Sequence, residues 1–154
     1  MPKADRLSTL RALLSGVRTA SLSTLDRGAP FGSMVPFAWD PAGRALIHVS
    51  ALARHTRHLE ADPRVALLVT ETDGPGKNPL ALQRACLTGT MRKVARGTPA
   101  YEAAKALYVA RFPGSAMVFQ LPDFTFYTLA PEAIHLVAGF GQAFAIDPAE
   151  LAGA

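Results

Sequence analysis

The sequence has very little cysteine and no long apolar run, and each absence excludes a class of protein. Cys86 is the only cysteine, so an internal disulfide is impossible and a reducing compartment is expected. No apolar stretch approaches the roughly 18 residues that a membrane-spanning helix needs. The N-terminus carries Lys3 and Arg6 but lacks the apolar segment and cleavage site of a secretory signal. We therefore expect a cytoplasmic protein that does not bind membranes.

Blocks of one charge and recognised metal-ligand motifs are also missing. The net charge is +4, but the basic residues are dispersed, so nucleic-acid binding is not expected. His55 and His58 lie three residues apart, yet no carboxylate or cysteine joins them at a recognised ligand spacing, so no metal site is expected. No Gly-x-Ser-x-Gly elbow occurs, and the Gly-x-Gly at 139–141 lacks the third glycine of a dinucleotide site.

The composition and the hydrophobic pattern of the sequence are those of one globular domain. The chain has 154 residues, of which 49% are hydrophobic and 18% charged. We divide the domain 1–154 into an N-terminal helix at 1–18, a barrel at 19–145 and a tail at 146–154. Leucines at helical spacing predict a helix over 5–17, and a Thr-Pro start predicts another over 98–112. Strands are expected at 20–25, 31–39, 46–50, 65–69, 85–94, 123–130 and 133–138.

The connections between these strands favour an antiparallel barrel. The early strands are joined by turns rather than helices, which excludes a doubly wound fold. A small closed or nearly closed barrel with flanking helices hides the strand edges. Pro36 lies within an expected strand and predicts an edge or a bulge, and Gly89 predicts a close approach to another group.

The segment from Leu46 to Thr70 carries the strongest functional signal. It predicts a strand ending at Ser50, a short basic helix over 51–61 that Asp62-Pro63 terminates, and a second strand. A hydroxyl, basic side chains and free N–H groups at a helix start form a site for an anion, and the planar fork of arginine suits phosphate. The alternative is that the arginines of this helix lie on a solvated face, the commonest position of arginine.

Three blocks of the sequence resemble a known family. They are Pro30–Phe37, Ser50–Val69 and Asp123–Ala143, and the similarity extends from about Ala20 to Phe144. In order and spacing they are similar to the pyridoxamine 5′-phosphate oxidase-like, FMN-binding split-barrel family, nearest the branch that includes haem-utilisation proteins.

This resemblance implies a mainly β fold, a six- to seven-stranded antiparallel split barrel, and a homodimer with FMN at the subunit interface. Ser33, Met34 and Val35 would contact the flavin ring. The ribityl phosphate would be held by Ser50, His55, Thr56 and Arg57. Taken together with the anion-binding pattern, the expected cofactor-binding residues are Ser33, Met34, Val35, Ser50, Arg54, His55, Thr56, Arg57 and, as a further candidate for the phosphate, Arg92.

Because the sequence departs from the family pattern, we expect FMN rather than haem as the ligand. The phosphate-binding helix often has a lysine or arginine where this chain has His55, and haem-utilisation relatives often carry an extra C-terminal domain or a histidine-bearing tail. The last histidine here is His135. Three functions stay open: an FMN-dependent oxidoreductase, a haem-binding or haem-degrading protein, and a non-catalytic flavin binder. No acid–base residue stands out near the expected ring, so the sequence names no catalytic residue and no substrate.

Overall fold

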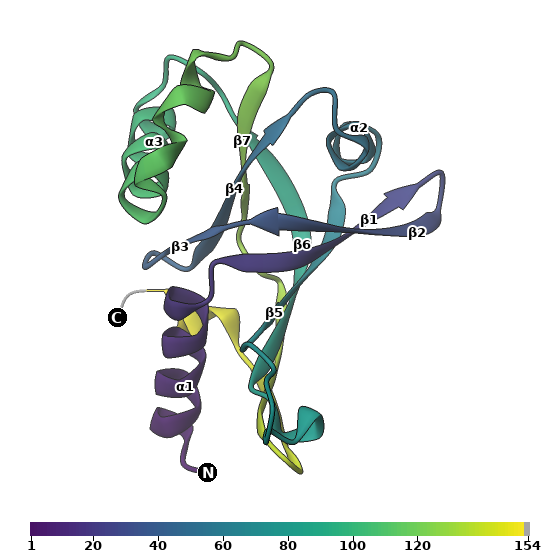
Figure 1. Cartoon of the computed structure of the whole chain (residues 1–154), viewed down its shortest axis with the longest axis vertical. Coiled ribbons are helices and arrows are strands. Elements are labelled where there is room, and N and C mark those ends of the chain that lie inside the picture. Colours follow the sequence, from purple (N-terminus) through teal and green to yellow (C-terminus); the bar gives the residue numbers. More distant parts are fainter. Residues whose placement is uncertain (153–154) are drawn as a thin grey trace.

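The computed structural model describes residues 1–152, and the last two residues of the predicted tail lie outside them (Figure 1). The strands are β1 (Thr19–Asp26), β2 (Ala29–Pro36), β3 (Ala38–Asp40), β4 (Arg44–Ser50), β5 (Arg64–Thr70), β6 (Arg84–Val94), β7 (Phe124–Leu129), β8 (Ala133–Gly139) and β9 (Gln142–Ile146). The helices are α1 (Lys3–Gly16), α2 (Arg54–Ala61) and α3 (Pro99–Arg111), with 3₁₀ helices η1 (Pro79–Ala81), η2 (Pro113–Gln120) and η3 (Pro148–Glu150). Within 1–152, no helix is long and apolar enough to cross a membrane.

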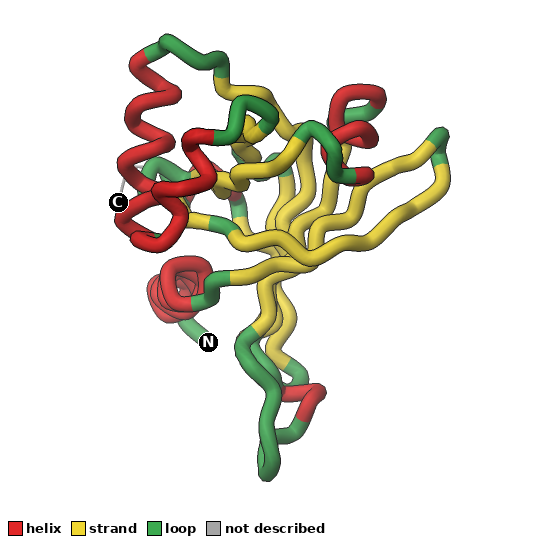
Figure 2. The backbone as a smooth tube through the Cα atoms, turned by 45° about the horizontal axis from the view of Figure 1, so that its top comes forward, coloured by secondary structure: helices red, strands yellow, loops and turns green. Residues whose placement is uncertain are grey.

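The strands form one curved antiparallel sheet with the helices outside it (Figure 2). Their order is β2-β1-β5-β6-β7-β4-β3, and β8 and β9 branch from β6. The first part of the 11-residue strand β6 pairs with β5 and β8, and its last part pairs with β7. The predicted mainly β antiparallel architecture with flanking helices is therefore confirmed.

The predicted number of six to seven strands was wrong, because the sheet has nine strands within residues 1–152. The expected strand at 31–39 is divided: β2 ends at Pro36, which has no N–H to continue the ladder, and the Phe37 N–H instead donates to the Arg18 carbonyl at 3.0 Å. At the other end of the chain, Gly141 takes a φ of +72° and reverses the chain between β8 and β9. The edge position expected for the Pro36 strand is confirmed, since β2 ends the sheet order.

The core lies inside this curved sheet. Its largest fully buried side chains include Leu22, Phe37, Ile47, Leu67, Leu87, Leu129 and Leu136. Helix α1 adds Leu10, Leu13 and Leu14 to the same cluster, so the predicted apolar stripe of this helix packs on the barrel. Each such side chain contributes about 1.5–3 kcal/mol when fully buried.

The glycine expected at a close approach is confirmed. A Cβ atom at Gly89 would lie 3.1 Å from Leu129 Cδ1 and 3.3 Å from the Ala130 carbonyl oxygen. Leu129 ends β7 and Ala130 directly follows it, close to where β6 changes its pairing from β5 to β7. A side chain at this position would therefore push β7 away from β6.

A second, aromatic cluster lies outside the sheet, beneath α3. This helix begins as predicted, because Thr98 Oγ1 accepts the Tyr101 N–H at 3.2 Å and Pro99 occupies the first turn. Tyr101 and Tyr108 on α3 pack against Phe126 of β7, which is fully buried. The cluster fixes α3 on the outer face of β4 and β7.

His48 is the most unusual member of this outer cluster. It is 7% exposed, and its ring stacks against Phe126 and against Phe119, with ring centroids 4.2 and 4.8 Å away. Phe124 and Tyr108 lie 5.3 and 5.5 Å away. Burial, with a smaller effect from the charge of Arg96, lowers the pKa of His48 from its ordinary 6.5 to about 4.

Stability should therefore fall as the pH drops from 6.5 toward 4. The folded-state pKa of His48 lies below the unfolded value, so its contribution is complete above pH 6.5 and is lost as the pH falls through about 4. We expect this residue to account for a loss of about 2–3 kcal/mol between pH 7 and pH 4.5. Urea unfolding at both pH values measures the loss, and His48→Phe, which does not titrate, should lose less by that amount. Equal losses in the two proteins would contradict the prediction.

Candidate functional site

Helix α2 projects from the end of β4 beside the β1–β2 hairpin (Figure 1). The chain leaves β4 at Ser50 and makes a turn, in which the Ala53 N–H donates to the Ser50 carbonyl at 3.2 Å. The helix therefore begins at Arg54, three residues later than predicted. It ends as predicted, because Asp62 before Pro63 is extended, with a φ of −147°.

The hydroxyl of Ser50 is engaged by the protein itself. It donates to Asp123 Oδ2 at 2.7 Å and accepts the Leu52 N–H at 3.1 Å. The Ala51 N–H also donates to the Asp123 carbonyl, at 2.7 Å. Ser50 thus joins the start of α2 to the start of β7, and a bound anion would have to displace one of these partners.

Arg54 lies in a cluster that attaches α2 to the hairpin. Its guanidinium lies 4.4 Å above the ring of Phe31 and 3.7 Å from Asp26 Oδ2. The same carboxylate oxygen is 3.7 Å from Nε2 of His58, whose Nδ1 shares a buried 2.8 Å hydrogen bond with Thr24 Oγ1. Much of the charge of Arg54 is therefore balanced by Asp26.

The next residues of α2 differ sharply in environment. Arg57 is exposed, and its side chain has no ion pair or hydrogen bond to any residue of 1–152. Thr56 is 1% exposed, and its hydroxyl has no hydrogen-bond partner in the same range. Burial, and then the neighbouring His58, lower the pKa of His55, so its imidazole is neutral near pH 7. With respect to residues 1–152, Arg57 is therefore the arginine of this helix that has no partner.

The residues expected beside a flavin ring lie on β2, the strand that ends the sheet order. Ser33 and Val35 point into the barrel, where Val35 is 2% exposed and the Ser33 hydroxyl has no partner among the described residues. Met34 points outward and is 66% exposed. The alternation of a strand thus divides the three residues between two faces, and one planar ring cannot contact all three side chains from one side.

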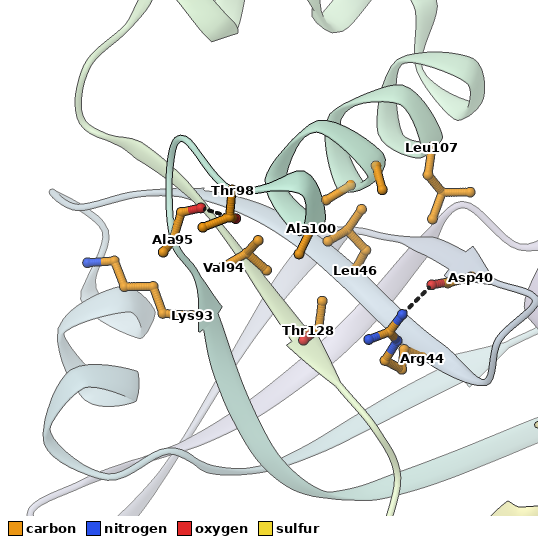
Figure 3. Close-up of a pocket in the computed structure, with 12 residues that line it drawn as sticks. Asp40, Arg44, Leu46, Lys93, Val94, Ala95, Thr98, Ala100, Leu107 and Thr128 are labelled. Carbon is orange, nitrogen blue, oxygen red and sulfur yellow. Dashed lines mark hydrogen bonds and ion pairs between the residues drawn. The ribbon is translucent and has the colours of Figure 1, made fainter.

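Two of the cavities within residues 1–152 adjoin on the outer side of the sheet, where Lys93 lines both. The larger, of about 520 Å³, lies between α3 and the strands beneath it, and its walls include Arg44, Leu46, Lys93 and Leu107 (Figure 3). None of the predicted cofactor residues lines it. The smaller, of about 220 Å³, is lined by Thr56 together with Lys93, Arg96, Asp123 and Phe124. Arg92 lies on β6 opposite Thr128 and lines neither cavity.

A model of the CREG β-barrel family matches residues 2–152 of the chain. The chain belongs to this family. Two proteins with similar sequences are named for haem: the chloroplastic haem oxygenase HOZ of Arabidopsis thaliana, 35% identical over 92% of the chain, and the haem oxygenase HutZ of Vibrio cholerae, 31% identical over 87%. The chain spans 44% of the length of HOZ and 77% of that of HutZ.

Solved structures confirm the split-barrel fold of this CREG-family chain. A haem-binding protein of Mycobacterium smegmatis superposes with a TM-score of 0.85 at 22% identity, covering 98% of this chain and 60% of that one. A pyridoxamine 5′-phosphate oxidase-type protein of Listeria innocua gives 0.66 at 16% identity, covering 86% of this chain and 98% of that one. At these identities the likeness shows the fold alone. The two relatives named for haem confirm the predicted similarity to haem-utilisation proteins, whereas the likeness to the pyridoxamine 5′-phosphate oxidase-type protein is limited to the fold.

Sequence reasoning missed two residues beside α2 in this CREG-type barrel. Asp123 accepts the Ser50 hydroxyl from 73 positions away, and Arg96 donates to the carbonyls of Pro122 and Phe124. No local pattern indicates either contact, because each partner is far away in the sequence. Together they fix the segment that enters β7.

Replacing Arg57 tests whether α2 holds an anionic group. We expect Arg57→Ala to weaken binding of FMN or haem about ten- to hundredfold, since a charge-assisted hydrogen bond contributes about 1.5–3 kcal/mol. Lys77→Ala is the matched control, because it removes a cation from the exposed 71–78 loop between β5 and β6. Fluorescence titration at constant salt measures both. Equal affinities in the Arg57 variant and the wild type would place the anion elsewhere, with Arg92 next to be tested.

Proposed function

We propose that this protein binds haem and acts in haem utilisation, as a haem oxygenase-type protein on a split barrel. The observation that carries the proposal is the sequence similarity, over about nine-tenths of the chain, to two proteins named as haem oxygenases from a plant and a bacterium. The order expected from the sequence alone, FMN first and haem second, is therefore reversed.

The chemistry of the chain suits haem. Haem carries two carboxylates, and the exposed Arg57, with Arg54 one turn earlier on α2, offers cationic partners for them. Its iron takes a neutral imidazole as ligand, and the lowered pKa values of His48 and His55 keep both rings neutral near pH 7. When bound, the haem would supply the oxygen chemistry, and the protein would supply binding and orientation.

FMN is the second candidate, and a specific observation favours it. The basic start of α2 lies near β2, whose Ser33 hydroxyl is buried without a partner among residues 1–152. A phosphate and a flavin ring would each find donors there. The solved structures that suggest flavin are distant, however, so this observation supports a site rather than a cofactor.

Ligand titration separates the two candidates. We expect haemin to give a stoichiometric complex with a Soret band shifted from that of free haemin, and to bind at least tenfold more tightly than FMN, whose fluorescence reports its binding. Adding ascorbate under air to the haem complex then tests for breakdown, which removes the Soret band. Tight FMN binding together with unshifted haemin would contradict the proposal and favour a flavoprotein.

We also propose that the protein is a homodimer that pairs through the outer face of β1, β2, β5, β6 and β8. Cross-strand register places Met34, Ser21, Leu68, Cys86 and His135 in one row on this face. Met34 is 66% and Leu68 39% exposed, while the alternate residues of each strand are buried inside. An open sheet face with apolar and small side chains is suited to a second copy of itself.

Light scattering after size-exclusion chromatography tests the dimer. We expect twice the 16.3 kDa of one chain for the wild type and for Leu80→Lys, because Leu80 is exposed on η1 and does not belong to that row of residues. Leu68→Lys should give a monomer, since it puts two like charges into a pairing surface. A wild-type monomer at micromolar concentration would overturn the dimer.

A further inference from the structure

The face of α3 that borders the 520 Å³ cavity carries little side-chain volume. Four residues at spacings of three and four form this face of the helix: Ala100, Ala103, Ala104 and Leu107. The neighbouring face carries Tyr101 and Tyr108, which pack against Phe126 of β7. These large rings separate the helix from the strands, whereas alanines leave the adjoining space unfilled. The cavity therefore follows from the sequence of α3.

The cavity is apolar along its walls and charged at its sides. Leu46, which is 2% exposed, points from β4 toward α3, and Arg44 and Lys93 lie on opposite sides of the cavity (Figure 3). Arg44 forms an ion pair with Asp40 at 3.2 Å, whereas Lys93 makes no ion pair with any residue of 1–152. Sites for small organic ligands have volumes of about 300–1,000 Å³, apolar walls and a few polar groups. This cavity has those properties, and its unbalanced charge is positive.

A buried hydroxyl without a partner lies beyond Lys93. Thr56 lines the smaller, 220 Å³ cavity, which adjoins the larger one at Lys93. Thr56 is 1% exposed, and its Oγ1 atom has no hydrogen-bond partner in the part of the chain that the structure describes. A buried polar group without a partner destabilises a fold, and such groups in native proteins commonly have a functional role. An oxygen of a ligand beside Lys93 would accept a hydrogen bond from this hydroxyl.

The charges of the smaller cavity favour a ligand with one negative charge. Lys93 and Arg96 are its cations, and Glu60 and Asp123 are its acids. Arg96 donates to backbone carbonyls, and Asp123 accepts the hydroxyl of Ser50. Lys93 is thus the cation that remains for a ligand, while Glu60 repels a second negative charge. A carboxylate suits this balance better than a phosphate dianion.

We propose that the 520 Å³ cavity binds a small amphipathic carboxylate. Its apolar body lies between α3 and Leu46, and its carboxylate meets the ammonium of Lys93 and the hydroxyl of Thr56 where the two cavities adjoin. The site uses the space that the structure already has. It is separate from the exposed Arg57 and from the open sheet face, so it goes beyond the proposed function and does not depend on haem.

Nuclear magnetic resonance of isotope-labelled protein locates the bound ligand. The probes are two acids, decanoate and naphthoate, together with decanol, which has the apolar chain of decanoate without its charge. We expect both acids to shift the amide signals of Leu46, Ala100 and Ala103 before others. Decanol should shift the same signals but bind about tenfold more weakly than decanoate, because it lacks the charge-assisted hydrogen bond to Lys93.

Matched variants test the two parts of the site. Lys93→Met should weaken decanoate about tenfold and leave decanol unchanged, whereas Lys105→Met, on α3 outside both cavities, should change neither. Ala103→Phe should weaken both probes by filling the cavity, and Ala106→Phe, exposed on the same helix outside the cavity, should not. Thr56→Val should weaken decanoate several-fold, and Thr56→Ser, which retains the hydroxyl, should not.

Each part of the proposal has a result that overturns it. No shifted signals with either acid at millimolar concentration would overturn the site, as would shifts at Met34 and Leu68 instead, which belong to the open sheet face. Equal affinities for decanoate and decanol, or for decanoate in Lys93→Met and wild type, would overturn the recognition of a carboxylate. If circular dichroism shows that Ala103→Phe is unfolded, Ala103→Leu is titrated in its place. None of these titrations uses haemin, so their outcome is independent of the proposed function.

Discussion

The pairing of one long strand, β6, with three others determines the architecture. Its first part holds β5 on one side and β8 on the other, and its last part leaves both to pair with β7. This change of partner bends the sheet around the core, and Gly89 lies near the change, where a side chain would not fit. The sheet has two outer faces. The face of β4 and β7 is covered by α3 and η2, whereas the face of β1, β2, β5, β6 and β8 stays open.

Local signals in the sequence predicted the start of α3, the end of α2 and the general architecture. Thr98-Pro99 and Asp62-Pro63 specify their boundaries through backbone chemistry that depends only on neighbouring residues. The strand boundaries around Pro36 and Gly141 were wrong, although both residues are recognised breakers. A proline or glycine indicates that a strand is interrupted. Pairing with the neighbouring strands decides whether the strand bends, ends or is followed by a reversal of the chain.

The candidate site was predicted less completely, for the same reason. The sequence placed Arg54 and Arg57 together as anion-binding residues, but Asp26 and Phe31 engage Arg54 from the hairpin and leave Arg57 free. The environment of His48 was invisible, because its aromatic neighbours lie 60 to 78 positions away along the chain. Such contacts arise only when the sheet and α3 have assembled.

The hydrogen bonds between Ser50 and Asp123 give α2 and η2 a common support. Asp123 lies three residues after the end of η2, and its carboxylate and carbonyl hold the turn that starts α2. An anion drawn to α2 competes for the Ser50 hydroxyl and so loosens the C-terminal support of η2. Anion binding at α2 and loosening of η2 are then linked equilibria, in which each favours the other by the same factor.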